Sequence, residues 1–158
     1  MRDAPGAWNE DAARAVIAKL KGERGSLLLV LQAIDETFGH VPDAAVAIVA
    51  EQLNLSRAEV HGVRTFYHDL REERRGRHVL KICRAEACQS MGGEKLAEKT
   101  ARTLGIPFGG TVPDGSLTLE AVYCLGLCAC APSALFDGRP VGRLNDKTVK
   151  ALIAEAQA

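Results

Sequence analysis

The chain has 158 residues, and its 20 basic residues balance its 20 acidic residues. This balance gives no electrostatic reason to expect a nucleic-acid partner or an anionic membrane surface. The longest apolar run, Leu27 to Leu31, is far below the roughly 18 residues that a membrane-spanning helix needs. We therefore expect no direct membrane insertion.

The first half of the chain has the patterns of a helical bundle. Four helices with short links are expected, each from a capping residue or an apolar repeat at helical spacing. Gly39 is placed to end the second of them. The first helix is capped by Asn9, and the second spans Ser26 to Phe38. The third has Pro42 in its first turn, and the fourth begins with a capping box of Ser56 and Glu59.

The polar tract from Arg71 to His78 predicts a boundary between a helical domain, residues 1–74, and a second domain, residues 75–158. In the second domain strand and helix patterns follow the order β-α-β-β-α. They are a strand His78–Cys83, a helix Gly92–Leu104 capped by Ser90, a strand Leu117–Val122, two strands Ala134–Phe136 and Val141–Leu144 around the turn Asp137-Gly138, and a helix Asp146–Glu155 capped by Asn145. The predicted fold class is α+β, with a helical bundle followed by a thioredoxin-like α/β domain.

Four of the five cysteines form two pairs, Cys83-x4-Cys88 and Cys124-x3-Cys128. Each pair follows a predicted strand, at the end where open α/β sheets usually place their sites. Four thiolates meeting there favour a [2Fe–2S] cluster, because loops of three and four residues suit two bridged irons. Plant-type ferredoxins also use a C-x4-C element.

Other uses of the cysteines stay open at this point. C-x3-C is less typical of zinc than C-x2-C or C-x4-C, but a zinc-stabilised interaction module remains an alternative. The N-terminus lacks the apolar region of a secretory signal, so we expect a cytoplasmic protein with reduced thiols rather than disulfides. We interpret the surplus Cys130 as a buried small hydrophobic residue, with a spare ligand or a peroxide-sensing thiol as alternatives.

Charged residues and glycines beside the cysteines suggest how a cluster could be tuned. A cation at Arg84 would ease reduction and an anion at Glu86 would resist it, although solvated loop charges are the favoured interpretation. Gly92, Gly93 and Gly126 would let backbone amides approach the sulfur atoms closely.

Taken together, these motifs resemble a known family. The cysteine spacing, the stretch FGHVPDAAVAIVAEQLNLSRAEVHGVRTFYHDL and the segment PDGSLTLEAVYCLGLC are similar to the small thioredoxin-like [2Fe–2S] subunit, the 24 kDa-type subunit of respiratory complex I. NAD-reducing hydrogenases and NAD-dependent formate dehydrogenases share this subunit. The segments CRAEACQSMGG and CLGLCACAPSAL are most like the gamma subunit of NAD-dependent, molybdenum-containing formate dehydrogenase.

The resemblance implies that Cys83 and Cys88 hold one iron and that Cys124 and Cys128 hold the other. It also implies single-electron exchange with the FMN of a partner flavoprotein that binds NAD, within a formate dehydrogenase complex. A larger catalytic subunit containing molybdenum or iron–sulfur clusters is the second expected partner. The same role in complex I or an NAD-reducing hydrogenase is the alternative. The chain has no flavin, NAD or molybdenum motif, so we expect a non-catalytic electron-transfer subunit with no catalytic residue.

Overall fold

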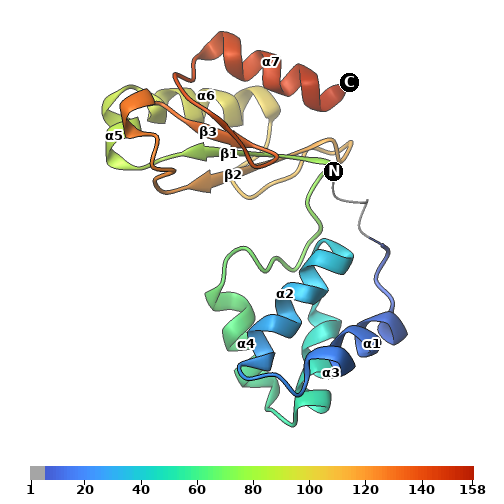
Figure 1. The fold of residues 1–158 in the computed structure, drawn as a ribbon. Coiled ribbons are helices and arrows are strands. Elements are labelled where there is room, and N and C mark those ends of the chain that lie inside the picture. The colour runs from blue at the N-terminus through green and yellow to red at the C-terminus, as the bar shows by residue number, and fades with distance from the viewer. Residues whose placement is uncertain (1–5) are drawn as a thin grey trace. The chain divides into compact units, whose positions relative to one another are not determined.

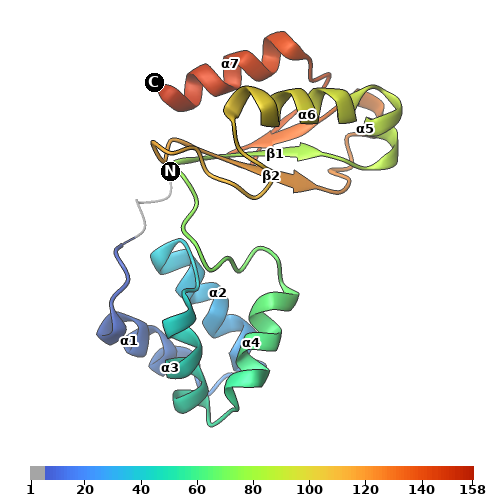
Figure 2. The ribbon, with the colours of Figure 1, turned by 180° about the vertical axis from the view of Figure 1, so that it is seen from behind.

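The computed structural model describes residues 6–158. The chain divides into two compact units, Met1–Arg74 and Arg75–Ala158. The described part of the first unit is helical, and the second combines a mixed sheet with helices (Figure 1 and, from behind, Figure 2). The α+β fold class predicted from the sequence is confirmed.

The first unit contains four helices in residues 6–74, and their caps explain where they begin. The Asn9 side chain accepts a hydrogen bond from the N–H of Ala12 at 2.9 Å, and Ser56 and Glu59 form the predicted capping box. The second helix ends at Gly39, which has a left-handed backbone with φ 76°. The helices are α1 (Glu10–Leu20), α2 (Ser26–Phe38), α3 (Asp43–Leu53) and α4 (Arg57–Phe66).

The core of this unit lies between the apolar faces of the four helices. Trp8 packs on Phe38, with 5.0 Å between the two ring centroids, so the segment before α1 is attached to the bundle. The buried Arg64 is held by carboxylates of Asp43 and Glu72, each at 3.6 Å. The largest fully buried side chains of the unit are Ile17, Val30, Leu31, Ile34, Phe38, Val41, Val49 and Val60.

The second unit is built on a four-stranded sheet in the order β2-β1-β3-β4. The central β1 pairs in parallel with β2 and antiparallel with β3, which pairs antiparallel with β4. Both ribbon views show α6 and α7 on the same side of this sheet. The elements are β1 (His78–Cys83), α5 (Glu86–Ser90), α6 (Gly93–Leu104), β2 (Leu117–Val122), a short 3₁₀ turn (Cys128–Cys130), β3 (Ala134–Phe136), β4 (Arg139–Val141) and α7 (Asp146–Gln157).

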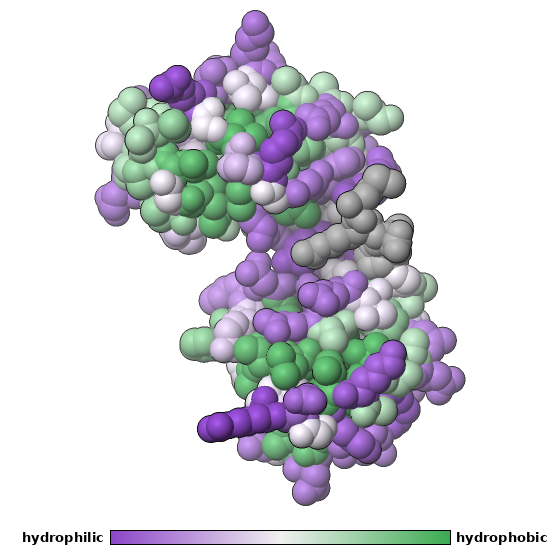
Figure 3. All heavy atoms as spheres, in the orientation of Figure 1, coloured by the Kyte–Doolittle hydropathy of each residue, from purple (hydrophilic) through white to green (hydrophobic). Residues whose placement is uncertain are grey.

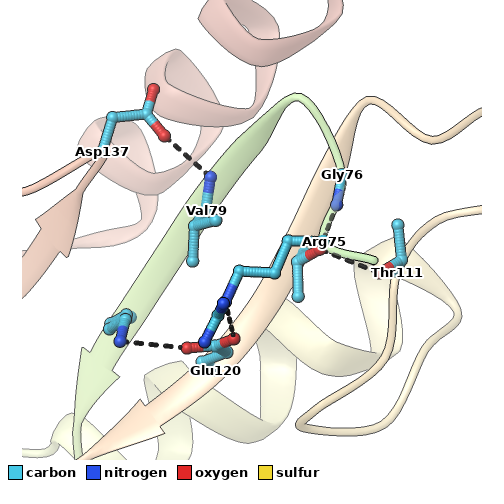
Figure 4. Close-up of polar contacts among 8 residues, drawn as sticks. Arg75, Gly76, Val79, Thr111, Glu120 and Asp137 are labelled. Atoms are coloured by element: carbon cyan, nitrogen blue, oxygen red, sulfur yellow. Dashed lines mark hydrogen bonds and ion pairs between the residues drawn. The ribbon is translucent and has the colours of Figure 1, made fainter. Parts of the chain in front are cut away.

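Alternating side chains of β1 separate the core from a polar face of the sheet. Leu80 and Ile82 are fully buried, whereas Lys81 pairs with Glu120 of β2 at 3.1 Å. Glu120 also accepts a hydrogen bond from Arg75 at 2.9 Å (Figure 4). Burial raises the pKa of Glu120, but the two cations lower it below its ordinary value overall. These contacts link β1 to β2 in the register that places Cys83 opposite Val122.

Two details of the sequence prediction are wrong. Ser90 does not cap the helix that follows: it ends the separate helix α5, and its hydroxyl donates to the carbonyl of Ala87. Gly92, with φ 83°, provides the cap of α6.

The last strand of the predicted hairpin is shifted. The structure places β4 at Arg139–Val141 rather than at 141–144. The turn has only two residues, Asp137 and Gly138, both with positive φ (51° and 81°). This tight turn sets Arg139 directly opposite Phe136. Asp137 is fixed by a hydrogen bond from the N–H of Val79, drawn in Figure 4.

None of the helices in residues 6–158 combines the length and the apolar character needed to cross a lipid bilayer.

Candidate metal centre

The four paired cysteines come from four different local settings in the second unit. Cys83 is the last residue of β1 and Cys88 lies within α5, so both belong to regular elements. Cys124 follows β2 with a left-handed backbone, φ 68°, and Cys128 opens the 3₁₀ turn. We name Cys83 and Cys88 the inner pair, because each is only 2% exposed. Cys124 and Cys128 are exposed and form the outer pair.

The fold brings the two pairs together although they are far apart in sequence. The N–H groups of Cys124 and Leu125, in the loop after β2, lie close enough to the sulfur of Cys83 to lower its pKa. Both inner cysteines lie close enough to Cys128 for their charges to affect its ionisation. The Sγ atoms of Cys124 and Cys128 are 3.8 Å apart. The segments that carry the two pairs therefore lie near each other at the end of the sheet next to α5 (Figure 1).

Electrostatics distinguish the inner pair from the outer pair. Burial raises the pKa of the Cys83 thiol, but hydrogen bonds from the N–H of Ala85, from Cys88 and from the outer loop lower it overall. The pKa of Cys128 is raised, first by its hydrogen bond with Cys124 and then by the charge of that neighbour. The inner thiolate is thus stabilised by donors, whereas the outer thiol resists ionisation beside other sulfurs.

The chain around the inner cysteines is fixed by close packing. A Cβ atom added at Gly93 would lie 2.5 Å from the carbonyl oxygen of Cys88, so only glycine permits this approach of α6 to α5. The N–H of Cys83 donates to the carbonyl of Ser133 at 2.9 Å. The hydroxyl of Ser133 lies 3.5 Å from the Sγ of Cys88. Both contacts tie the inner pair to the start of β3.

The charge of Arg84, beside Cys83, is compensated. Its guanidinium makes two hydrogen bonds to the carboxylate of Glu94 on α6 and lies over the ring of Phe108, 4.9 Å from the centroid. The hydrogen bond with Glu94 raises the pKa of Arg84. The interpretation of Arg84 as a freely solvated loop charge is therefore wrong.

The fifth cysteine, Cys130, is half-buried rather than fully buried. A Cβ atom at Gly142 would meet the Cβ of Cys130 at 2.8 Å, so the two chain segments are in contact. The N–H of Arg143 also donates to the Cys130 carbonyl at 2.6 Å. Cys130 therefore packs against the segment that follows β4.

The donor set fits an iron–sulfur cluster. Two thiolates at about 2.3 Å from a tetrahedral metal ion are about 3.8 Å apart, and the outer pair has this spacing. Within residues 6–158, no group of three or more His, Cys, Asp and Glu side chains is arranged to hold a metal ion. A two-iron cluster needs only two protein thiolates on each iron. Two separate pairs with backbone N–H donors suit it better than they suit a single zinc ion.

A thioredoxin-like sheet with four thiols converging at one end defines a small iron–sulfur protein of the electron-carrier type. Comparison with known families agrees: the chain belongs to the family of thioredoxin-like [2Fe-2S] ferredoxins, which matches residues 13–157. The cofactor of this family is the [2Fe–2S] cluster, so this part of the sequence prediction is confirmed.

Individual relatives are components of larger oxidoreductases. The chain is similar to the E subunit of the NADH-quinone oxidoreductase of Pseudomonas aeruginosa, with 32% identity over 82% of this chain and 78% of the relative. It is similar to an E subunit, numbered 2, of the NADH-quinone oxidoreductase of Rhizobium meliloti, with 33% identity over 91% of this chain and 86% of the relative. It also matches HndA, a component of the NADP-reducing hydrogenase of Solidesulfovibrio fructosivorans, with 29% identity over 88% of this chain and 81% of the relative.

A solved structure agrees with the fold. A chain of the NAD⁺-reducing [NiFe]-hydrogenase in the air-oxidized state superposes with a TM-score of 0.68 and 25% identity. The match covers 83% of the present chain but only 22% of the hydrogenase chain.

Sequence reasoning missed two features of this site. Ser133 lies far from both inner cysteines in sequence, and only the pairing of β1 with β3 brings it to them. Glu94 is one of several charged residues on α6, and only the fold shows that it pairs with Arg84.

Proposed function

We propose that this protein is an electron-transfer subunit with one [2Fe–2S] cluster, held by Cys83 and Cys88 on one iron and by Cys124 and Cys128 on the other. The observation that carries the proposal is the convergence of these four sulfurs at one end of the sheet, within a chain of the [2Fe-2S] ferredoxin family. A bound [2Fe–2S] cluster accepts and returns one electron at a time.

The residues of the chain have separable tasks in this role. The inner pair and the N–H donors around Cys83 hold negative charge in a place with little access to water. The exposed outer pair leaves one side of the site open to a partner. The proposal gives the chain a role in electron transfer and no catalytic residue.

We propose that the electron partner is a flavoprotein subunit that binds FMN and NAD. Flavin chemistry handles hydride, a two-electron species, and needs a neighbouring one-electron carrier to release electrons singly. The names of the relatives support an NAD(P)-linked complex, because they are subunits of NADH-quinone oxidoreductases and of an NADP-reducing hydrogenase. The complex is proposed to act in the cytoplasm, where thiols stay reduced.

For the parent complex we propose an NAD-dependent formate dehydrogenase with a larger catalytic subunit containing molybdenum or iron–sulfur clusters. The support is the segments CRAEACQSMGG and CLGLCACAPSAL, including a cysteine at position 130. The alternative, the equivalent subunit of a complex I or of an NAD-reducing hydrogenase, fits the relatives described above equally well.

The cluster is tested on the purified full-length protein. We expect a brown protein with iron and acid-labile sulfide in equal amounts and an S = 1/2 EPR signal after reduction by dithionite. A colourless protein that contains zinc and no acid-labile sulfide would refute the cluster and support a zinc-stabilised interaction module.

The parent complex is tested by affinity purification of the tagged chain from its native cells, followed by mass spectrometry. A flavoprotein and a formate-oxidising large subunit in stoichiometric amounts would support the proposal. Membrane-arm subunits of complex I, or a hydrogenase large subunit, would replace formate dehydrogenase with the corresponding alternative.

A further inference from the structure

The residue that contacts both inner cysteines is Ser133, immediately before β3. Its backbone carbonyl accepts the N–H of Cys83 at 2.9 Å, and its hydroxyl lies 3.5 Å from the Sγ of Cys88. Ser133 is only 1% exposed. Within residues 6–158, the structure gives its hydroxyl no other hydrogen-bond partner.

The direction of this hydrogen bond follows from the chemistry of the two groups. A thiolate that binds a metal carries no proton and can only accept, whereas a serine hydroxyl can donate. Bulk water does not reach this contact, because both Ser133 and Cys88 are buried. The exposed outer pair differs, since water or a partner can supply donors to its sulfurs.

We propose that Ser133 is a positioning residue that donates a hydrogen bond to the Cys88 thiolate and thereby raises the reduction potential of the cluster. This inference rests on the proposed function, because it needs Cys88 as a ligand. A hydrogen bond withdraws negative charge from the sulfur. Reduction adds one electron to a site that is already negative, so a fixed donor stabilises the reduced form more than the oxidised form.

The test is an EPR-monitored redox titration of the full-length protein with its cluster. Ser133→Ala removes the donor with little change in volume. At the midpoint potential of the wild type, we expect the ratio of reduced to oxidised cluster to fall by about threefold to tenfold, a tenfold change being about 59 mV for one electron.

Thr100→Val is the matched control in the same unit. Thr100 is a buried residue whose hydroxyl donates to the carbonyl of Leu96 within α6, so its loss removes a part-buried hydrogen bond that involves no cysteine. We expect the control to change thermal stability and to leave the midpoint potential unchanged. An unchanged potential in Ser133→Ala, or an equal shift in Thr100→Val, would overturn the inference.

Ser133→Thr keeps the hydroxyl and covers the case in which the alanine variant does not assemble a cluster. A midpoint potential equal to the wild type in Ser133→Thr supports the hydroxyl as the cause, and a lowered potential refutes it. Absence of a cluster from the wild type would refute the proposed function itself, and is therefore distinct from either result.

Discussion

The two cysteine pairs meet at one site, but the fold treats them in opposite ways. The inner pair is built into β1 and α5 and is almost fully enclosed. The outer pair lies on irregular chain after β2 and is exposed. Backbone donors gather at Cys83, whereas Cys128 has its pKa raised by neighbouring sulfurs. One half of the centre is therefore set by regular structure and the other half by a loop.

This difference suggests separate roles for the two pairs: the inner pair would protect the cluster, and the outer pair would face a partner protein. Enclosed ligands protect a cluster from water and fix its charge environment, and exposed ligands shorten the path to a partner. Large apolar side chains, Met91 at 63% and Tyr123 at 71% exposure, lie close in sequence to α5 and to the outer pair. Figure 3 shows hydrophobic residues gathered at the end of the unit that carries α5. In the proposed centre, the outer pair would thus be the side that faces an electron partner.

The largest expected effect comes from replacing the four proposed ligands. Cys83→Ser and Cys88→Ser should abolish the cluster, because an enclosed serine oxygen on a rigid element cannot move to compensate for its shorter bond to carbon. Cys124→Ser and Cys128→Ser should impair assembly but retain part of the cluster, because the exposed loop can adjust. Iron and acid-labile sulfide contents measure both outcomes.

Cys130→Ala is the control for this series, and it should leave the EPR signal of the reduced cluster intact. Equal losses in the inner and outer variants would remove the distinction between the pairs. Loss of the signal in Cys130→Ala would show that the ligand assignment is wrong.

The next largest effect concerns the glycines beside each pair. Gly93→Ala places a Cβ against the backbone of Cys88, and we expect a loss of about 3 kcal/mol in the free energy of unfolding, at the upper end of overpacking costs. For Gly126→Ala, between Cys124 and Cys128, the added Cβ has no atom within 4 Å. The only cost is the strain of a positive φ, 74°, which is about 1 kcal/mol. Urea denaturation of the apo-protein measures both values.

Gly62→Ala on α4 is a suitable control, because no atom lies within 4 Å of the added Cβ and its φ is not positive. It should not destabilise the protein. A cost at Gly126 as large as that at Gly93 would contradict the tighter packing beside the inner pair.

Local signals were sufficient to predict most elements, and long-range contacts were not. The caps at Asn9 and Ser56 and the strand His78–Cys83 depend on neighbouring residues and are confirmed by the structure. Helix α5 has only five residues and no side-chain cap, so its sequence carries little signal. The missed strand Arg139–Val141 contains a proline, and only the two-residue turn sets it opposite β3.

The candidate site shows the same division. The spacing of the cysteines predicted which sulfurs would meet, because strand ends in one sheet are neighbours. The asymmetry between the pairs could not be predicted, because burial of Cys83 and Cys88 depends on how β3, α6 and the outer loop pack around them. Arg84 follows β1 and Glu94 lies on α6, and the positions of these charges in the sequence do not indicate that the two side chains pair.

A smaller effect is expected in the titration of the apo-protein. The N–H donors around Cys83 lower its pKa, so its thiolate should form below the ordinary value for cysteine as the pH rises. Cys128 should ionise above that value, because its hydrogen bond with Cys124, and then the charge of that neighbour, raise its pKa. The ultraviolet absorbance of the thiolates, compared between the wild type and single variants, follows both steps against pH.

Single replacements assign the two steps. Cys83→Ser should remove the step at lower pH, and Cys128→Ser should remove the step at higher pH. Cys124→Ser should bring the pKa of Cys128 down, because it removes the first cause of the upward shift. Ionisation of Cys128 at a lower pH than Cys83 would contradict the predicted order of the two pKa values.

The smallest expected effect concerns the compensated charge beside the inner pair. Glu94→Gln leaves the guanidinium of Arg84 without its carboxylate, so a net positive charge then lies next to Cys83. The added electron is stabilised by this charge, and the midpoint potential should become more positive. The side chains of Arg84 and Glu94 are 30% and 33% exposed, so water screens the effect. A unit charge at about 10 Å in water contributes about 0.4 kcal/mol, or about twofold in the ratio of reduced to oxidised cluster.

Glu155→Gln tests whether the shift in midpoint potential depends on where the negative charge is removed rather than on the net charge of the protein. It breaks the exposed ion pair with Arg139 in the same unit, and the side chains of that pair are more than half exposed. We expect no change in potential for this variant, and a shift for Glu94→Gln that shrinks as ionic strength rises. A negative shift in Glu94→Gln would show that the carboxylate acts through the position of Arg84 rather than through its charge. The position of Arg84, and not its charge, would then set its effect on the midpoint potential of the cluster.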